Sequence, residues 1–125
     1  MKLRTLLMLQ ALYPVMGGGY LVVRYLQLRS GIVQLSASPL WAIPIFLVYA
    51  VCLLLGVRRK ELPYRITMAA AIPICATDGV LINILTYAHT GTASYGSTAV
   101  WAVGVAIHSY GLILNVLAAI GAYRR

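Results

Sequence analysis

Long apolar stretches separated by short polar connectors dominate the chain. A helix needs about 20 predominantly apolar residues to cross the hydrocarbon core of a membrane. Four stretches of about this length occur, at roughly residues 5–28, 39–57, 66–88 and 97–123. None shows the alternation of apolar and polar residues that is typical of a membrane β-barrel strand. The pattern predicts an all-α, polytopic integral membrane protein, with residues 1–125 forming a single transmembrane domain, a four-helix bundle.

The first stretch also resembles a signal peptide at its start, with basic residues before a short apolar core. Apolar residues continue beyond Gly17, Gly18 and Gly19, so we expect a retained span. Pro14 and these glycines are expected to kink the helix, since proline removes a backbone donor and glycine eases bending.

The connectors differ sharply in charge. Most basic residues lie before the first span, between the second and third spans, or after the fourth span. They are Lys2, Arg4, Arg58, Arg59, Lys60, Arg65, Arg124 and Arg125. The other two connectors hold Arg29 in one case and no charged residue in the other. Short loops rich in Lys and Arg stay on the cytoplasmic side. The sequence therefore predicts an N-in/C-in topology, in a bacterial inner membrane, or facing the matrix in an organelle.

Composition supports lipid as the solvent. Hydrophobic residues make up 62% of the chain and charged residues only 10%, against about 25% charged in soluble proteins. A net charge of +8 would suggest nucleic acid in a soluble chain, but the basic residues form short clusters without an aromatic-studded face. No nucleic-acid partner is expected. Cys52 and Cys75 lie in apolar runs without metal-ligand spacing, so we interpret them as packing residues and expect no metal or cofactor.

One acidic residue lies inside the third span. The stretch PICATDGVLIN contains Asp78, one of two acidic residues in the chain. A carboxylate alone in hydrocarbon is costly, and such residues usually face the bundle interior with a partner. His108 falls at a similar depth on the antiparallel fourth span, so we predict an intramembrane polar pair of Asp78 and His108. Pro73 could create a local break that exposes carbonyls beside the carboxylate.

Three roles stay open for Asp78. It could be a neutral carboxyl that fixes helix register through a hydrogen bond, which the sequence favours. It could be a proton or cation site, because histidine and aspartate at mid-membrane are the ingredients of a proton relay. It could also meet a basic residue of a partner subunit.

The fourth span carries a stripe of small and polar residues at alternating spacings of four and three: Ser97, Trp101, Gly104, His108, Gly111, Asn115, Ala118 and Ala122. This period of 3.5 is typical of left-handed helix packing. Small residues let helix backbones approach, and polar residues bond across the contact. We predict that this helix-packing seam faces protein. Tyr13 and Tyr110 lie deep enough to donate to it.

Other residues near span ends are expected at the membrane surface. Arg24 is expected to reach the outer head groups along its apolar stem. Most tyrosines, including Tyr64, are expected in an aromatic belt at the interface.

Two function classes stay open. No nucleophile–base pair, phosphate loop or metal cluster is apparent, so the sequence predicts a protein that is not an enzyme. The first class is an accessory, partner-binding subunit of a larger membrane assembly, such as an immunity-type inhibitor. The second is a small proton-coupled transporter or channel that uses Asp78 and His108 and works as a homo-oligomer, because four helices rarely enclose a path alone. The small chain and its small-residue faces favour the first class.

Overall fold

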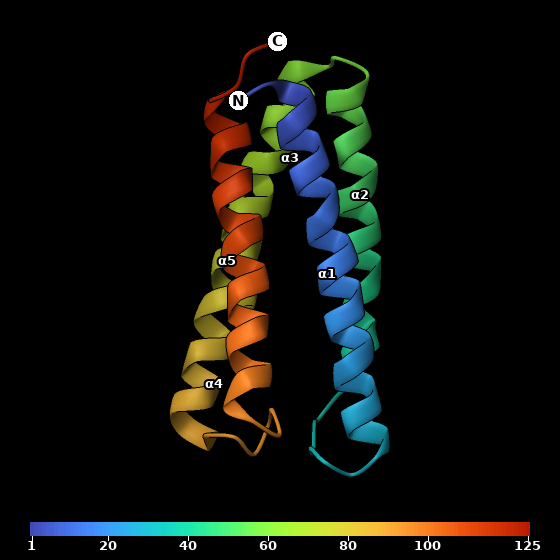
Figure 1. The fold of residues 1–125 in the computed structure, drawn as a ribbon, viewed down its shortest axis with the longest axis vertical. Helices are drawn as coiled ribbons and strands as arrows, with labels where there is room; N and C mark the ends of the chain where they lie inside the picture. Colours follow the sequence, from blue (N-terminus) through green and yellow to red (C-terminus); the bar gives the residue numbers. More distant parts are fainter.

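The structure, a computed structural model, describes residues 1–125. It contains helices α1 (Leu3–Arg29), α2 (Ile43–Val57), α3 (Glu61–Ile74), α4 (Ile82–Thr90) and α5 (Thr98–Ile120), with a 3₁₀ turn η1 (Pro39–Ala42) and a π-helical segment η2 (Cys75–Leu81). The segments α3, η2 and α4 follow one another without a break, and η1 leads directly into α2. Four rods therefore pack side by side in an up-and-down bundle (Figure 1).

The predicted fold class is confirmed. Four helical segments are long and apolar enough to cross a membrane: Leu3–Arg29, Pro39–Val57, Glu61–Thr90 and Thr98–Ile120. The chain is thus an all-α, multi-pass membrane protein. The second span has the predicted bounds, and the first continues unbroken through Pro14. The fourth ends earlier than predicted, because Gly121 adopts a left-handed conformation (φ 73°) that closes the helix.

Both termini and the turn between α2 and α3 lie at one end of the bundle (Figure 1). The backbone N–H of Arg124 donates to the carbonyl of Met1, and that of Leu3 donates to the carbonyl of Arg124, each at 2.8 Å. Arg125 forms an ion pair with Glu61 at 2.8 Å. The basic connectors therefore gather at this end, which we call the basic end; the other end holds the two weakly charged loops.

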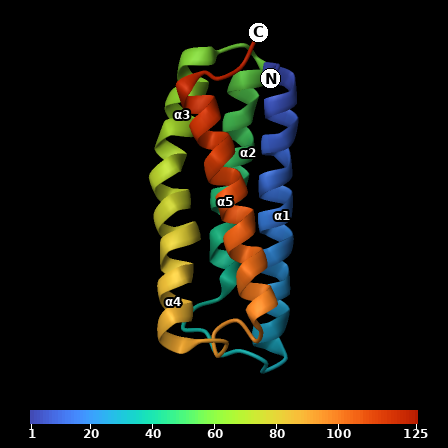
Figure 2. The same ribbon diagram turned by 60° about the vertical axis from the view of Figure 1, so that its left-hand side comes forward.

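The rods do not contact each other equally along their length. α1 packs on α2 and α5, and α5 packs on α3, η2 and α4. α2 packs on α3, but no Cα atom of α2 or η1 lies within 8 Å of one in η2 or α4. α1 and α2 thus diverge from α4 and α5 away from the basic end (Figure 1). A turned view places α5 between α1 and the rod formed by α3 and α4 (Figure 2).

Glycines on α5 allow its close approach to α1. A Cβ atom at Gly104 would lie 2.5 Å from the hydroxyl oxygen of Tyr20, and one at Gly111 would lie 2.6 Å from the Tyr13 ring. Asn115 and Ala118, further along the same stripe, are fully buried. Aromatic rings of α1 therefore lie across glycines of α5, and the stripe is occupied by contacts within the chain.

Candidate functional site

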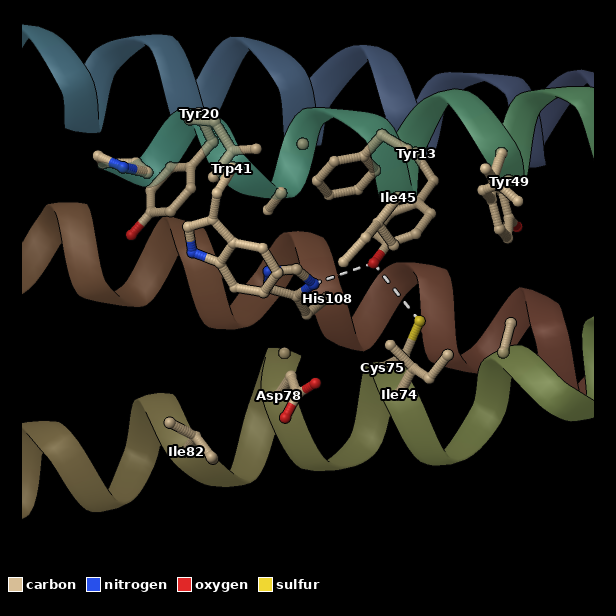
Figure 3. A pocket seen from close by; sticks show the side chains of 18 of the residues that line it. Tyr13, Tyr20, Trp41, Ile45, Tyr49, Ile74, Cys75, Asp78, Ile82 and His108 are labelled. Atoms are coloured by element: carbon tan, nitrogen blue, oxygen red, sulfur yellow. Dashed lines mark hydrogen bonds between the residues drawn. The ribbon is translucent and has the colours of Figure 1, made fainter. Parts of the chain in front are cut away.

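A cavity of about 620 Å³ lies between α1 and α2 on one side and η2 and α4 on the other (Figure 3). Its lining is mostly apolar. It extends from Cys52 and Met68, in the half of the bundle nearer the termini, to loop residues 35–37 at the opposite end. The Cα atoms of α2 and η1 stay more than 8 Å from those of η2 and α4, and the lining residues Trp41, Ile45 and Ile82 are exposed, so the cavity also opens sideways, toward the lipid.

The wall that carries Asp78 is a widened helical turn. Pro73 has no backbone N–H to donate, and the π-helical η2 begins two residues later. Such wide turns are rare, and they occur often at functional sites. The side-chain amide of Asn83 donates to the carbonyl of Gly79 at 2.7 Å and to that of Asp78 at 3.4 Å. The local break expected at Pro73 is therefore a widening, whose carbonyls are partly satisfied by Asn83.

Asp78 is exposed on this wall, and its carboxylate points into the cavity (Figure 3). The carboxylate forms no hydrogen bond or ion pair with any residue of the chain; the one ion pair is that of Glu61 with Arg125. It lies near the middle of the Glu61–Thr90 span. The molecule therefore presents an unpaired carboxylate at membrane depth.

The expected contact between Asp78 and His108 is not made. His108 lines the same cavity, but its Nδ1 is hydrogen-bonded to the hydroxyl of Tyr13 at 3.0 Å. The residue of η2 that meets the His108 ring is Gly79, where a Cβ would lie 2.6 Å from the imidazole. The wide turn thus directs the glycine toward α5 and leaves the neighbouring carboxylate facing the cavity. Similar depth did not imply contact.

A group of buried polar side chains joins the four rods in the half of the bundle nearer the basic end, and one of them, Tyr49, also lines the cavity. We call Gln10, Tyr49, Tyr64 and Asn115 the polar core. Asn115 Oδ1 accepts from Tyr49 at 2.7 Å and from Gln10 Nε2 at 3.3 Å, and Tyr64 donates to Gln10 Oε1. Asn115 Nδ2 lies 3.5 Å from the sulfur of Cys75. All four members are buried, and together they join α1, α2, α3 and α5.

The polar core corrects two sequence interpretations. Tyr64 is fully buried and does not belong to an aromatic belt, because its hydroxyl bonds an amide in the interior. Gln10 was missed, although an amide inside the apolar run TLLMLQALY was a visible signal. Tyr13 does form a hydrogen bond with the α5 stripe, at His108, while Tyr110 donates to the carbonyl of Leu9 instead.

Arg24 turns inward at the end away from the termini and does not reach outward to head groups as expected. It is only 7% exposed. Its guanidinium donates to the carbonyl of Ser94 and to Gln27 Oε1, and it lies 4.7 Å from the Tyr95 ring centroid. The α4–α5 loop supplies both a carbonyl and an aromatic face, so the charge is satisfied there. Burial raises the pKa of the Tyr95 hydroxyl, which therefore stays a neutral donor to Asn83 Oδ1 at 2.7 Å.

The outer members of the α5 stripe have structural roles. Ser97 caps the helix by accepting from the backbone N–H of Val100 at 3.2 Å. The Trp101 ring stacks on Tyr87 with centroids 4.2 Å apart. Ala122 lies beyond the last turn of α5 and is exposed, so the stripe ends at Ala118.

No group of three or more His, Cys, Asp or Glu side chains comes together in a way that could hold a metal ion. No protein-family profile, curated protein or solved structure matches the chain.

Proposed function

We propose that the protein is a small membrane transporter whose substrate binds in the cavity beside Asp78. The observation that carries this proposal is an unpaired carboxylate, at membrane depth, on the wall of a largely apolar cavity. Ionisable residues inside membranes are rare, and they mark substrate or ion pathways. A purely architectural aspartate would be expected to have a hydrogen-bond partner within the bundle, and Asp78 has none.

The asymmetry of the bundle supports the same function. The cavity reaches the loops away from the basic end, whereas the polar core fills the interior of the bundle near the basic end. Alternating access requires a site near the bilayer midplane that is open to one side at a time. Side-chain hydrogen bonds in membrane proteins contribute about 0.6 kcal/mol each on average. The bonds of the polar core could therefore exchange with an open state at modest cost.

Asp78 provides a means of coupling. A carboxylate can hold a proton or bind a cation, but it does not hold both at once. Binding of a cationic substrate would therefore release a proton, and protonation would release the substrate. His108 and Tyr13 lie on the same cavity and can exchange hydrogen bonds with what enters it. A second copy of the chain would cover the open side between α2 and α4. In the proposed topology, the basic end faces the bacterial cytoplasm.

An accessory, partner-binding role is the second candidate. The small residues that favoured it in the sequence are largely used inside the chain, since Gly104, Gly111 and Gly79 all contact aromatic rings or His108. One observation still favours it: a Cβ atom at Gly18 or Gly19 would meet nothing within 4 Å. A partner helix could approach α1 closely there.

Charge movement in proteoliposomes tests the transporter proposal. The protein is adsorbed on a solid-supported membrane and subjected to pH jumps. Wild type should give a transient current, and Asp78→Asn should abolish it while keeping a monodisperse size-exclusion profile. Glu61→Gln is the matched control, because it removes the only other carboxylate, in an ion pair at the basic end, and should leave the current unchanged. Equal currents in wild type and Asp78→Asn would refute the proposal.

A further inference from the structure

We infer that the cavity binds an apolar organic cation, such as a hydrophobic ammonium or phosphonium compound, with its charge at Asp78 and its body among the aromatic side chains. This inference names the substrate class of the transporter proposed above and rests on that function. It depends on the size of the cavity, the chemistry of its lining, its charges and its opening.

The cavity is too large and too apolar for a bare inorganic ion. Its volume of about 620 Å³ lies within the range of about 300–1,000 Å³ typical of sites for drug-sized molecules. Hard divalent cations need about six to eight oxygen ligands, and no group of three His, Cys, Asp or Glu side chains gathers anywhere in the chain. A single carboxylate with apolar surroundings matches a cation that brings its own apolar surface.

Aromatic rings surround the space that Asp78 faces. Tyr13, Tyr20 and Trp41, on α1 and η1, line the cavity from the opposite side (Figure 3). Phe46, on α2, lines it as well. A cation over an aromatic face gains about 0.5–1 kcal/mol when exposed and about 2 kcal/mol when desolvated, most of all at tryptophan. Carboxylate on one wall and aromatic faces on the other therefore favour a cation with an organic body.

The charges on the cavity also favour a cation at Asp78. Three ionisable groups other than tyrosine and cysteine line it: Asp78, Arg24 and His108. Arg24 is satisfied by Ser94, Gln27 and the Tyr95 ring, and His108 is bonded to Tyr13. Only Asp78 has an unmet charge, so the cavity attracts a positive ligand there.

The opening suits a ligand that dissolves in lipid. Apolar side chains at the sideways opening are partly exposed, with Trp41 at 64%, Ile45 at 42% and Ile82 at 49%. On this side of the bundle, the backbones of α2 and η1 are separated from those of η2 and α4. An apolar cation partitions into the bilayer and could pass between these rods without crossing a polar loop.

Binding of tetraphenylphosphonium to the purified full chain tests the inference. Equilibrium dialysis in detergent, corrected with protein-free micelles, should show saturable binding to wild type. Asp78→Asn should weaken it by at least about tenfold, because the amide lacks the negative charge that pairs with the cation. Asp78→Glu keeps the negative charge and should retain binding, which shows that a substitution at this position is tolerated by the fold. Glu61→Gln should bind as wild type does.

Tetraphenylborate is the matched probe, because it has nearly the same shape and the opposite charge. It should not bind saturably. Equal binding of both probes, equal binding to wild type and Asp78→Asn, or no phosphonium binding would each overturn the inference. Absent phosphonium binding with intact pH-jump currents would leave the transporter proposal standing with another substrate. Asp78-dependent binding without currents would keep the site and remove the transport function.

Discussion

The two halves of the bundle are built from the same four rods but are held together differently. Near the basic end, the polar core contributes one side chain from each rod, and Gln10, Tyr64 and Asn115 are fully buried. In the other half, aromatic rings of α1 lie on glycines of α5, while α2 stands apart from η2 and α4. The hydrophobic effect does not draw helices together in lipid, because lipid tails are equally apolar, so close packing and hydrogen bonds must do so. Hydrogen bonds of the polar core hold the four rods together near the basic end. No hydrogen bond joins α2 to α4, so the other half stays open.

Tyr13 lies at the boundary between the halves. Its ring contacts Tyr49 edge-on at a centroid distance of 5.2 Å and Phe46 at 5.3 Å. Its hydroxyl lies 3.0 Å from His108 Nδ1 and 3.4 Å from the sulfur of Cys75. A ligand that changes the hydrogen bond of His108 would therefore act on the residue that also packs against the polar core.

The first prediction concerns which half of the bundle faces the cytoplasm, and a measurement of topology can give only one of two results. The positive charges at the basic end predict that this closed half faces the cytoplasm. Reporter fusions at Arg125 and at Thr92, in the α4–α5 loop, measure it directly. Cytoplasmic activity is expected at Arg125 and external activity at Thr92. The reverse pattern would place the open half inside and reject the predicted topology.

A bulky residue at Gly111 should strongly affect the boundary. Gly111→Leu would drive a side chain into the Tyr13 ring, which is only 4% exposed and held by His108. Overpacking of this kind costs about 1–3 kcal/mol or more, so we expect a large loss of monodisperse protein and a lower melting temperature in detergent. Val103→Leu, at a position that is 51% exposed, is the control on the same helix. Equal, mild effects from both would mean that the glycine contact does not hold α1 to α5.

The number and approximate positions of the spans could be predicted because membrane thickness sets the apolar length of each helix. The second span, Pro39–Val57, has the bounds that the apolar run gives. The same argument gives depth, which placed Asp78 and His108 at a similar level, and the structure puts both on one cavity. Depth does not give the direction in which a side chain points around its helix. That direction changes in η2, where the wide turn places Gly79 rather than Asp78 against His108.

The sequence also could not predict which polar residues from distant parts of the chain form pairs. Tyr64 resembles any tyrosine near a span end until Gln10 is known to lie opposite, because the same side chain suits an interface or a buried amide. Arg24 could likewise reach the head groups or turn inward. Its guanidinium turns inward because it donates to the carbonyl of Ser94. Such partners are far apart along the chain, and periodicity within one helix contains no information about them.

The smallest expected effect is the coupling free energy between Gln10 and Asn115 in the closed half, and a double-mutant cycle measures it. Asn115→Leu removes three side-chain contacts, with Tyr49, Gln10 and Cys75. At about 0.6 kcal/mol each, the loss of unfolding free energy should be about 2 kcal/mol.

Gln10→Leu combined with Asn115→Leu should cost less than the two single variants together, because each single variant strands the other amide. Gln27→Leu is the control, since this amide lies on the same helix but bonds Tyr95 and Arg24 in the open half; its effect should add to that of Asn115→Leu. Reversible unfolding in mixed micelles gives all the free energies. Additive costs for Gln10 and Asn115 would mean that their hydrogen bond contributes nothing. The closed half would then depend on the hydrogen bonds of Tyr49 and Tyr64, and the Gln10–Asn115 bond would not explain the contrast between the halves.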